Sequence, residues 1–311
     1  GADLAPDVVH AHDLDTLPAG WRLARRTGAR LVFDAHESYP DMLADNVAGP
    51  IKSLCRSLER FLVPRCDLLV TVGERLRSHY VAMGARRTEV VGNWRDPIGP
   101  PDEALRVRQA IRVDTGVKES AVFICFIANL TPERRLEPLL EAVERVPGVE
   151  LVVGGRGAGV EAARAAAARC PRIRFVGLVA PDDVARWTAA ADAVYYGFDP
   201  ENPNARFSAP NKLFEALAAG IPVVTARFGE IGEIVASTGC GILVPEYSPD
   251  ALADALRELS DPGRLEQLRR AARDAGRRYS RGAADRALVE AYRRMAPGAA
   301  WTLGLSRGEA A

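Results

Sequence analysis

The 311-residue sequence is poor in cysteine, balanced in charge and without long apolar runs. Its five cysteines are odd in number and scattered, and no pair is spaced as C-x-x-C, which favours reduced, structural thiols in a cytoplasmic protein. The 41 basic residues balance the 41 acidic ones, which argues against a general nucleic-acid-binding protein. No apolar stretch is long enough to cross a bilayer, and the first residues lack the basic-then-apolar pattern of a signal peptide.

Short apolar runs alternate with amphipathic helical segments along most of the chain, which predicts an α/β fold with parallel sheets. A polar, proline-rich stretch at 93–104 interrupts the alternation and is typical of a linker between domains. We therefore expect two Rossmann-like, doubly wound domains, with ligands at the carboxyl ends of the strands and in the cleft that the domains face. The expected strands are residues 6–12, 29–36, 66–73, 88–93, 121–130, 149–155, 173–177, 192–198, 222–226 and 241–245.

Histidines occur at the ends of two expected strands. His10 and His12 end the first strand, and their spacing puts both side chains on one face. H-x-H at a strand end also occurs in metal-dependent hydrolases, but only His36 and His79 remain as further histidine ligands, so we expect no metal site. The alternative is one core histidine and one polar cleft residue. His36 follows the second strand, where its imidazole could bind a sugar hydroxyl or could simply bond the backbone.

Two helices of the C-terminal half begin with cations. In "SAPNKLFEALAAGIPVV", residues 208–224, we expect Ser208 to cap a helix that Gly220 ends. Lys212 then lies near the positive end of the helix dipole, where a cation is unfavourable. Arg134 and Arg135 open another helix after a strand in the same way. We interpret the pair of helix starts as a diphosphate site, with independent exposed cations as the alternative.

Two further patterns leave alternatives open. The glycine-rich segment 154–159 follows a strand, but it does not match G-x-G-x-x-G and indicates only a sharp turn near a ligand. Residues 264–294 contain ten arginines against four acidic residues. This excess fits either a solvated helix face that pairs with acids of the other domain, or weak attraction to an anionic membrane surface.

The ordered set "PDVVHAHD", "LVFDAHE", "VELVVGG", "IRFVGLV" and "PNKLFEALAAGIPVVT" resembles the family 4 glycosyltransferases from about residue 6 to about residue 295. The resemblance implies the two-domain GT-B fold and transfer of a sugar, with retention of configuration, from a nucleotide-diphosphate donor without a catalytic metal or other cofactor. It also implies a partial acceptor-side domain at 1–100 and a donor-binding domain at 101–278. A C-terminal helix that packs back toward the N-terminal domain, and a tail, would occupy 279–311.

The same resemblance assigns roles to individual residues. Catalytic roles would fall to His36, beside the anomeric carbon, and to Arg134 and Lys212, at the phosphates. Glu215 would hold the ribose hydroxyls, and Leu178 and Val179 would frame the base through backbone groups. The donor side would also include Asn129, Ser208, Asn211 and Leu213, and the acceptor side would include His12 and Asp13.

The sequence departs from the family pattern at three places. Phe207 stands where many members have the first glutamate of a pair, so "PNKLFE" resembles a subgroup that uses Ser208, Asn211 and Lys212 instead. Asn129 stands where an arginine is frequent, which leaves Arg134 and Arg135 for the phosphates. The family also has about half a domain ahead of "PDVVHAHD", so we expect the N-terminal domain to be incomplete.

We therefore expect a retaining glycosyltransferase of the cytoplasm, with an unknown acceptor and no nucleic-acid partner. Peripheral membrane contact would run through the arginine-rich C-terminal segment. Two alternatives remain, a sugar-nucleotide epimerase and a non-catalytic partner of another glycosyltransferase.

Overall fold

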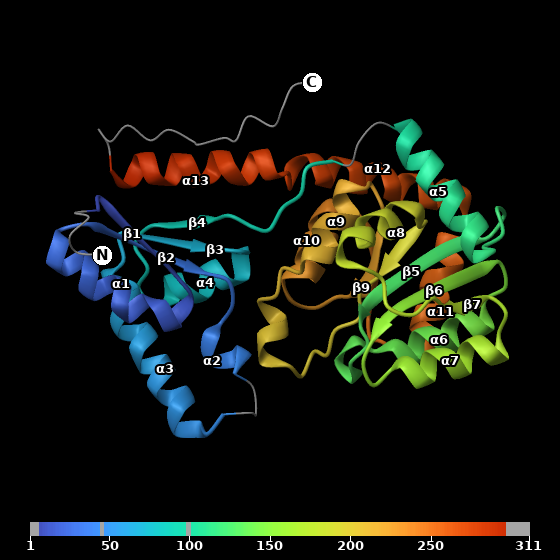
Figure 1. The fold of residues 1–311 in the computed structure, drawn as a ribbon, viewed down its shortest axis with the longest axis horizontal. Coiled ribbons are helices and arrows are strands. Elements are labelled where there is room, and N and C mark those ends of the chain that lie inside the picture. Colours follow the sequence, from blue (N-terminus) through green and yellow to red (C-terminus); the bar gives the residue numbers. More distant parts are fainter. Residues whose placement is uncertain (1–5, 44–46, 98–100, 297–311) are drawn as a thin grey trace. The chain divides into compact units, whose positions relative to one another are not determined.

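The computed structural model describes residues 6–43, 47–97 and 101–296. The chain divides into two compact units, which are residues 1–92 with 281–311 (unit 1) and residues 93–280 (unit 2). Each unit is built on one parallel sheet (Figure 1). The division falls after Gly92, before the expected boundary at residue 100. Part of the expected linker and the expected tail after residue 296 lie outside the described residues.

Unit 1 contains a four-stranded sheet in the order β1-β2-β3-β4. The helix α13 belongs to this unit, since Ala291 and Met295 share a buried cluster with Val32, Leu68 and Val70 of β2 and β3. The strands are β1 (Val8–His12), β2 (Arg30–Ala35), β3 (Leu68–Thr71) and β4 (Thr88–Val90). The helices are α1 (Asp13–Thr27), α2 (Tyr39–Met42), α3 (Gly49–Leu62), η3 (Val63–Arg65), α4 (Glu74–Ala82) and α13 (Arg281–Met295).

Unit 2 contains a six-stranded sheet in the order β10-β9-β8-β5-β6-β7. This is the doubly wound order, in which the chain reverses direction across the sheet between β5 and β8. Its strands are β5 (Val122–Asn129), β6 (Val149–Arg156), β7 (Ile173–Phe175), β8 (Ala193–Tyr195), β9 (Val223–Ala226) and β10 (Gly241–Val244). Its helices are α5 (Pro101–Thr115), η4 (Pro132–Arg134), α6 (Leu136–Arg145), α7 (Val160–Arg169), η5 (Pro181–Asp183), α8 (Val184–Ala190), η6 (Pro203–Arg206), α9 (Asn211–Ala218), α10 (Gly229–Thr238), α11 (Pro249–Leu259) and α12 (Pro262–Arg278).

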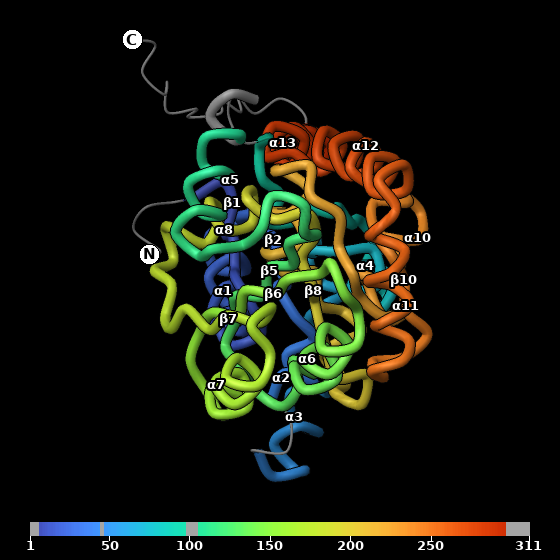
Figure 2. Tube along the Cα trace, turned by 90° about the vertical axis from the view of Figure 1, so that its right-hand side faces the viewer, coloured from blue at the N-terminus to red at the C-terminus, as the bar shows by residue number. Residues whose placement is uncertain are grey.

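The central strand β5 is buried on both faces, which explains its continuous apolar sequence. Phe123, Cys125 and Ile127 pack in the cluster that includes α5 and α8 residues. Ile124 and Phe126 point the other way, into the larger cluster under α6, α7 and α11. In Figure 2, α6 and α7 lie together on one side of unit 2, and α11 lies near α12. Helices thus cover both faces of the sheet.

Asp192, just before β8, is a buried hub of unit 2. Its carboxylate pairs with Arg108 and Arg112 at 2.7 Å each and accepts the Phe123 backbone N–H at 2.8 Å. Arg269 of α12 also pairs with it. A buried carboxylate needs such partners, because leaving its charge unpaired away from water is costly. The hub fixes α5 and α12 against the sheet.

One local expectation was wrong. Ser208 does not cap α9, which begins at Asn211 with Pro210 in the N-cap position and no side-chain cap. Gly220 does follow the helix, with a φ of +68° that favours glycine. The C-terminal helical segment consists of two helices, α12 and α13, separated at Tyr279 and Ser280. None of the described helices is long and apolar enough to span a membrane.

Candidate active site

In unit 2, the ends of β5 and β8 meet at the point where the strand order reverses, and Arg134 lies there. It belongs to η4, the short turn that follows β5. Its guanidinium donates a hydrogen bond to the Tyr196 hydroxyl at 2.8 Å and lies 5.2 Å from the ring centres of both Tyr196 and Phe198. Among the described residues, no carboxylate forms an ion pair with it. Arg134 is thus held by aromatic groups and keeps its charge available.

The loop that carries Arg134 is fixed by its contacts with the end of β8. The Tyr195 hydroxyl donates to the Arg135 carbonyl oxygen at 2.9 Å. At Gly197, a Cβ atom would fall 2.0 Å from the Arg134 carbonyl oxygen, so only glycine fits. Arg135 itself has a φ of +50° and pairs with Asp199 at 2.7 Å. The expectation that Arg135 also serves the phosphates stays a prediction, and the ion pair with Asp199 already uses this charge locally.

Lys212, in the first turn of α9, is largely buried. Burial lowers the pKa of its ammonium; the charges of Glu215 and Cys125 oppose this shift, and the positive charge of Arg134 adds to it. Within the part of the chain that the structure describes, Lys212 forms no ion pair within 4 Å. A buried ammonium beside a second cation is unfavourable unless an anion is present.

The remaining donor-side residues lie on the same unit. Asn211 is exposed at the start of α9, Leu213 is buried in the core, and Ser208 is half-buried before the helix. Asn129 is exposed at the last position of β5. Leu178 is 71% exposed after β7, whereas Val179 packs partly against the core. Phe207, where an acid was expected, is buried.

The glycines of segment 154–159 are explained by close packing against the end of β5. A Cβ atom at Gly155 would fall 1.8 Å from the Ala128 carbonyl oxygen, and one at Gly157 would fall 2.8 Å from that of Leu130. The Gly155 N–H also donates to the Gly177 carbonyl oxygen at 2.7 Å. These glycines therefore let three strand ends approach one another.

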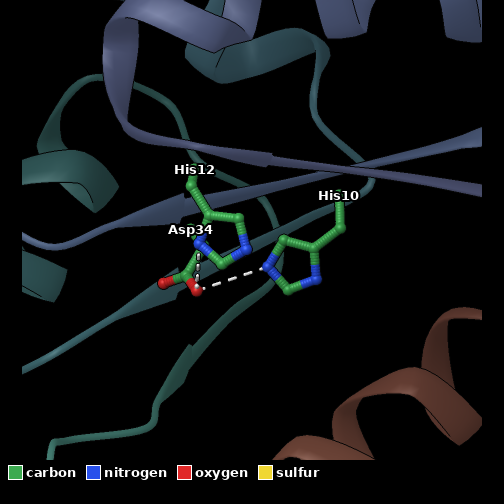
Figure 3. Close-up of side chains that lie close together, drawn as sticks. All are labelled: His10, His12 and Asp34. Atoms are coloured by element: carbon green, nitrogen blue, oxygen red, sulfur yellow. Dashed lines mark hydrogen bonds and ion pairs between the residues drawn. The ribbon is translucent and has the colours of Figure 1, made fainter.

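In unit 1, three histidines converge on Asp34 at the carboxyl edge of the sheet. The nitrogens of His10 (Nε2), His12 (Nδ1) and His36 (Nε2) lie 3.3, 3.2 and 3.5 Å from Asp34 Oδ2. Figure 3 shows the His10 and His12 rings beside this carboxylate. The strand register pairs His12 with Asp34, and the two-residue period brings the other two histidines to the same face.

Charge in this cluster favours an ionised Asp34. Burial raises the pKa of Asp34, but hydrogen bonds from His10 and His36 and their charges outweigh it, so the pKa lies well below its ordinary value. The hydrogen bond to Asp34 raises the pKa of His36, and burial opposes this. Asp13 accepts the His36 backbone N–H at 3.1 Å, and its own φ of +57° is unusual for a residue with a side chain.

The structure thus brings together two groups of the expected residues, each within its own unit. Arg134, Lys212 and Glu215 interact electrostatically in unit 2, and His12, Asp13 and His36 gather in unit 1. Sequence reasoning overlooked Asp34 and Tyr196. Asp34 lies two residues before His36, and Tyr196 lies in the strand expected at 192–198, so both could have been found from strand periodicity and topology.

A separate hollow of unit 1 lies away from this cluster. It has a volume of about 730 Å³ and is lined by Arg30, Cys66, Asp67 and Arg87 among others. These residues precede or begin β2, β3 and β4, so the hollow is at the amino edge of the sheet, opposite the histidines. Parallel α/β sheets bind ligands at the carboxyl edge.

Comparison with known families identifies both parts of the chain. A model described as "Glycosyl transferases group 1" matches residues 121–261. A second model, "Glycosyl transferase 4-like domain", matches residues 2–94. The two matches do not overlap, and together they cover most of the described chain.

Curated relatives and solved structures agree with these matches. D-inositol 3-phosphate glycosyltransferase of Mycobacteroides abscessus is 29% identical over 269 residues, or 81% of this chain and 58% of that protein. Glycogen synthase of Mycobacterium tuberculosis is 27% identical over 281 residues, or 86% of this chain and 64% of that protein. The Anabaena HepE protein in complex with UDP has a TM-score of 0.76 at 19% identity, with 94% of this chain and 80% of that chain covered. This last likeness shows the GT-B fold.

Proposed function

We propose that this chain, which carries a glycosyltransferase group 1 domain and a glycosyltransferase 4-like domain, transfers a sugar from a nucleotide-diphosphate donor to an acceptor hydroxyl. The observation that carries the proposal is the proximity of Arg134 and Lys212 at the switch point of unit 2. Both are cations without an ion pair among the described residues, and the positive charge of Arg134 helps to lower the pKa of Lys212. A donor diphosphate would neutralise them.

The proposed chemistry is stabilisation of a leaving diphosphate. As the bond between the sugar and the diphosphate breaks, negative charge grows on the phosphate oxygen. Arg134 and Lys212 would stabilise that charge, helped by the uncapped N–H groups at the start of α9. Removal of one such group from an active site typically costs about 10²–10³-fold in rate.

We propose retention of configuration, as the family resemblance implies. Among the described residues, none of the acids near the two groups forms the carboxylate pair of a glycosidase, which fits attack by the acceptor on the front face of the sugar. Asp34 and Asp13 are both occupied with histidines, and Glu215 lies beside Lys212. The departing phosphate oxygen would then take the acceptor proton on the same face of the sugar. His36 would contact the donor sugar, Glu215 the ribose, and Leu178 and Val179 the base. No metal or other cofactor takes part in the transfer.

Two other functions make different predictions. An epimerase would convert the nucleotide sugar without any acceptor. A non-catalytic partner would bind the donor without turnover, and Phe207 in place of an acid favours that alternative. Incubation with a radiolabelled nucleotide sugar separates the three, because only a transferase moves the label to an acceptor.

We place the protein in the cytoplasm, in peripheral contact with a membrane. Several arginines of segment 264–294 are already ion-paired, among them Arg264, Arg273, Arg277 and Arg294. Helix α3 offers a better surface for anionic lipid. Ile51, Leu54 and Phe61 are 50%, 67% and 45% exposed along one stripe of α3, and exposed arginines lie on and just after the same helix.

The experiment that tests the proposed function is an assay of transfer by the Lys212→Ala and Glu215→Ala variants. Both should lose transfer while the circular dichroism and the unfolding midpoint stay close to those of the wild type. Wild-type rates in either variant would refute the assignment. Because the acceptor is unknown, slow hydrolysis of the donor by water serves as the first readout.

A further inference from the structure

A cluster of potential metal ligands lies in unit 1. His10, His12 and Asp34 each offer one ligand atom, and these atoms all lie within 4.8 Å of one another. They come from two adjacent parallel strands, so the sheet itself fixes their spacing. The transfer reaction proposed above does not use His10 or Asp34 directly.

Two of the three separations between these atoms match a tetrahedral metal site. Zinc binds histidine nitrogen and carboxylate oxygen at about 2.0–2.2 Å, which places neighbouring ligand atoms of a tetrahedron about 3.4 Å apart. The two nitrogen–oxygen separations here are 3.3 and 3.2 Å. Little movement of the side chains would be needed to admit an ion.

Hydrogen bonds alone do not satisfy all the imidazole nitrogens that surround the Asp34 carboxylate. A carboxylate oxygen has two lone pairs, yet imidazole nitrogens of His10, His12 and His36 all lie within 3.5 Å of Asp34 Oδ2. The His10 and His12 rings are stacked, with centres 4.6 Å apart and planes 13° apart.

The outer contacts of the cluster are those of a metal site. His10 Nδ1, the nitrogen turned away from Asp34, is 2.5 Å from the Tyr292 hydroxyl of α13. Histidines that bind metals generally use the second nitrogen for such a hydrogen bond, which fixes the ring and its tautomer. The His12 side chain is 59% exposed, so an ion can enter from solvent.

We propose that His10, His12 and Asp34 bind a divalent transition-metal ion of the Zn²⁺ or Co²⁺ class. The ligand atoms are His10 Nε2, His12 Nδ1 and one Asp34 oxygen, with the remaining positions open to water. Two histidines and one carboxylate suit these ions better than Mg²⁺ or Ca²⁺, which prefer oxygen ligands. We had expected no metal site because too few further histidines were present to act as ligands. The Asp34 carboxylate is the additional ligand that this expectation did not consider.

Titration with Co²⁺ tests the proposal directly, because a protein-bound Co²⁺ ion in a four-coordinate site absorbs visible light far more strongly than the hydrated ion. Full-length protein should bind one Co²⁺, and Zn²⁺ should displace it and remove the band. His12→Ala changes a half-exposed side chain and should abolish the band. Asp34→Asn should weaken binding at least tenfold.

The matched control is His79→Ala, which removes a histidine of helix α4 that is not among the proposed ligands and should leave the titration unchanged. Cys55→Ser removes the half-buried thiol and should also have no effect. Absence of a Co²⁺ band in the wild type, or a band that persists in His12→Ala, would overturn the proposal. The readout does not involve sugar transfer, so its failure leaves the proposed function untouched.

Discussion

The Arg134 guanidinium and the Tyr196 hydroxyl are 2.8 Å apart, and this hydrogen bond joins the turn after β5 to the end of β8. The two residues lie on either side of the switch point of the sheet. The same tyrosine ring also lies under the guanidinium, 5.2 Å from it. Arg134 is therefore oriented before any ligand arrives, which reduces the entropy lost on binding.

Tyr196→Phe removes this hydrogen bond and keeps the ring. Because a hydrogen bond to a charged group contributes about 1.5–3 kcal/mol, we expect the affinity for a nucleoside diphosphate to fall about tenfold or more. Isothermal calorimetry measures the change. An unchanged affinity would mean that Arg134 does not contact the phosphates. Phe198→Leu, which leaves the hydrogen bond in place, serves as the comparison.

Asp192→Ala should destabilise unit 2 strongly. The substitution leaves Arg112, whose side chain is 3% exposed, without its carboxylate. Loss of one partner of a buried ion pair costs about 3–5 kcal/mol, which urea unfolding would detect. Asp250→Ala is the control, because its pair with Arg145 is at the surface and should cost less than about 1 kcal/mol. Equal losses in the two variants would contradict the role of Asp192 as a hub.

The buried Glu59 carboxyl group should make the free energy of unfolding depend on pH. Burial raises its pKa to about 7, partly offset by the hydrogen bond from Tyr80. The native state therefore holds a proton that the unfolded state releases near pH 4.5, so this contribution to stability falls as pH rises from about 4.5 to about 7. Over this pH range the free energy of unfolding falls by about 3 kcal/mol.

Glu59→Gln should remove this part of the pH dependence. The variant should gain stability relative to the wild type at pH 8 and show no gain at pH 4. Urea unfolding midpoints at the two pH values measure the difference. A constant difference between the two proteins from pH 4 to pH 8 would show that Glu59 stays ionised in the native state.

We expect helix α3 to form the surface that binds anionic lipid. Ile51→Ser, Leu54→Ser and Phe61→Ser together remove the exposed apolar stripe, and we expect them to reduce sedimentation with phosphatidylglycerol vesicles at least fivefold. Arg270→Gln together with Arg278→Gln, on α12, should have little effect. A larger loss in the α12 variant would instead place the contact on the C-terminal segment.

The sequence predicted the architecture better than the site. The run "AVFICFIANL" was readable as a strand buried on both faces because every side chain is apolar, and β5 occupies residues 122–129 of it. Gly220 was likewise readable as a helix end, and its φ is positive. The N-cap of α9 could not be predicted from the sequence, because Pro210 occupies that position by its backbone conformation and no side chain caps the helix.

Site residues were harder to predict because their partners are distant in sequence. Arg135 looked equivalent to Arg134, yet Asp199 neutralises it from another loop. Asp34 was part of the quoted motif "LVFDAHE", but its contacts with His10 and His12 depend on the strand register. Periodicity gives the face of a strand, whereas register and loop conformation decide which charges meet.

The most direct test of the account is the affinity of a nucleoside diphosphate, compared with that of its monophosphate, for wild type, Arg134→Ala and Lys212→Ala. UDP is the first ligand to try, since it is bound in the HepE structure. We predict that the wild type binds UDP at least tenfold more tightly than UMP and that this difference disappears in both variants. Equal preference for UDP over UMP in all three proteins would contradict a diphosphate site at Arg134 and Lys212.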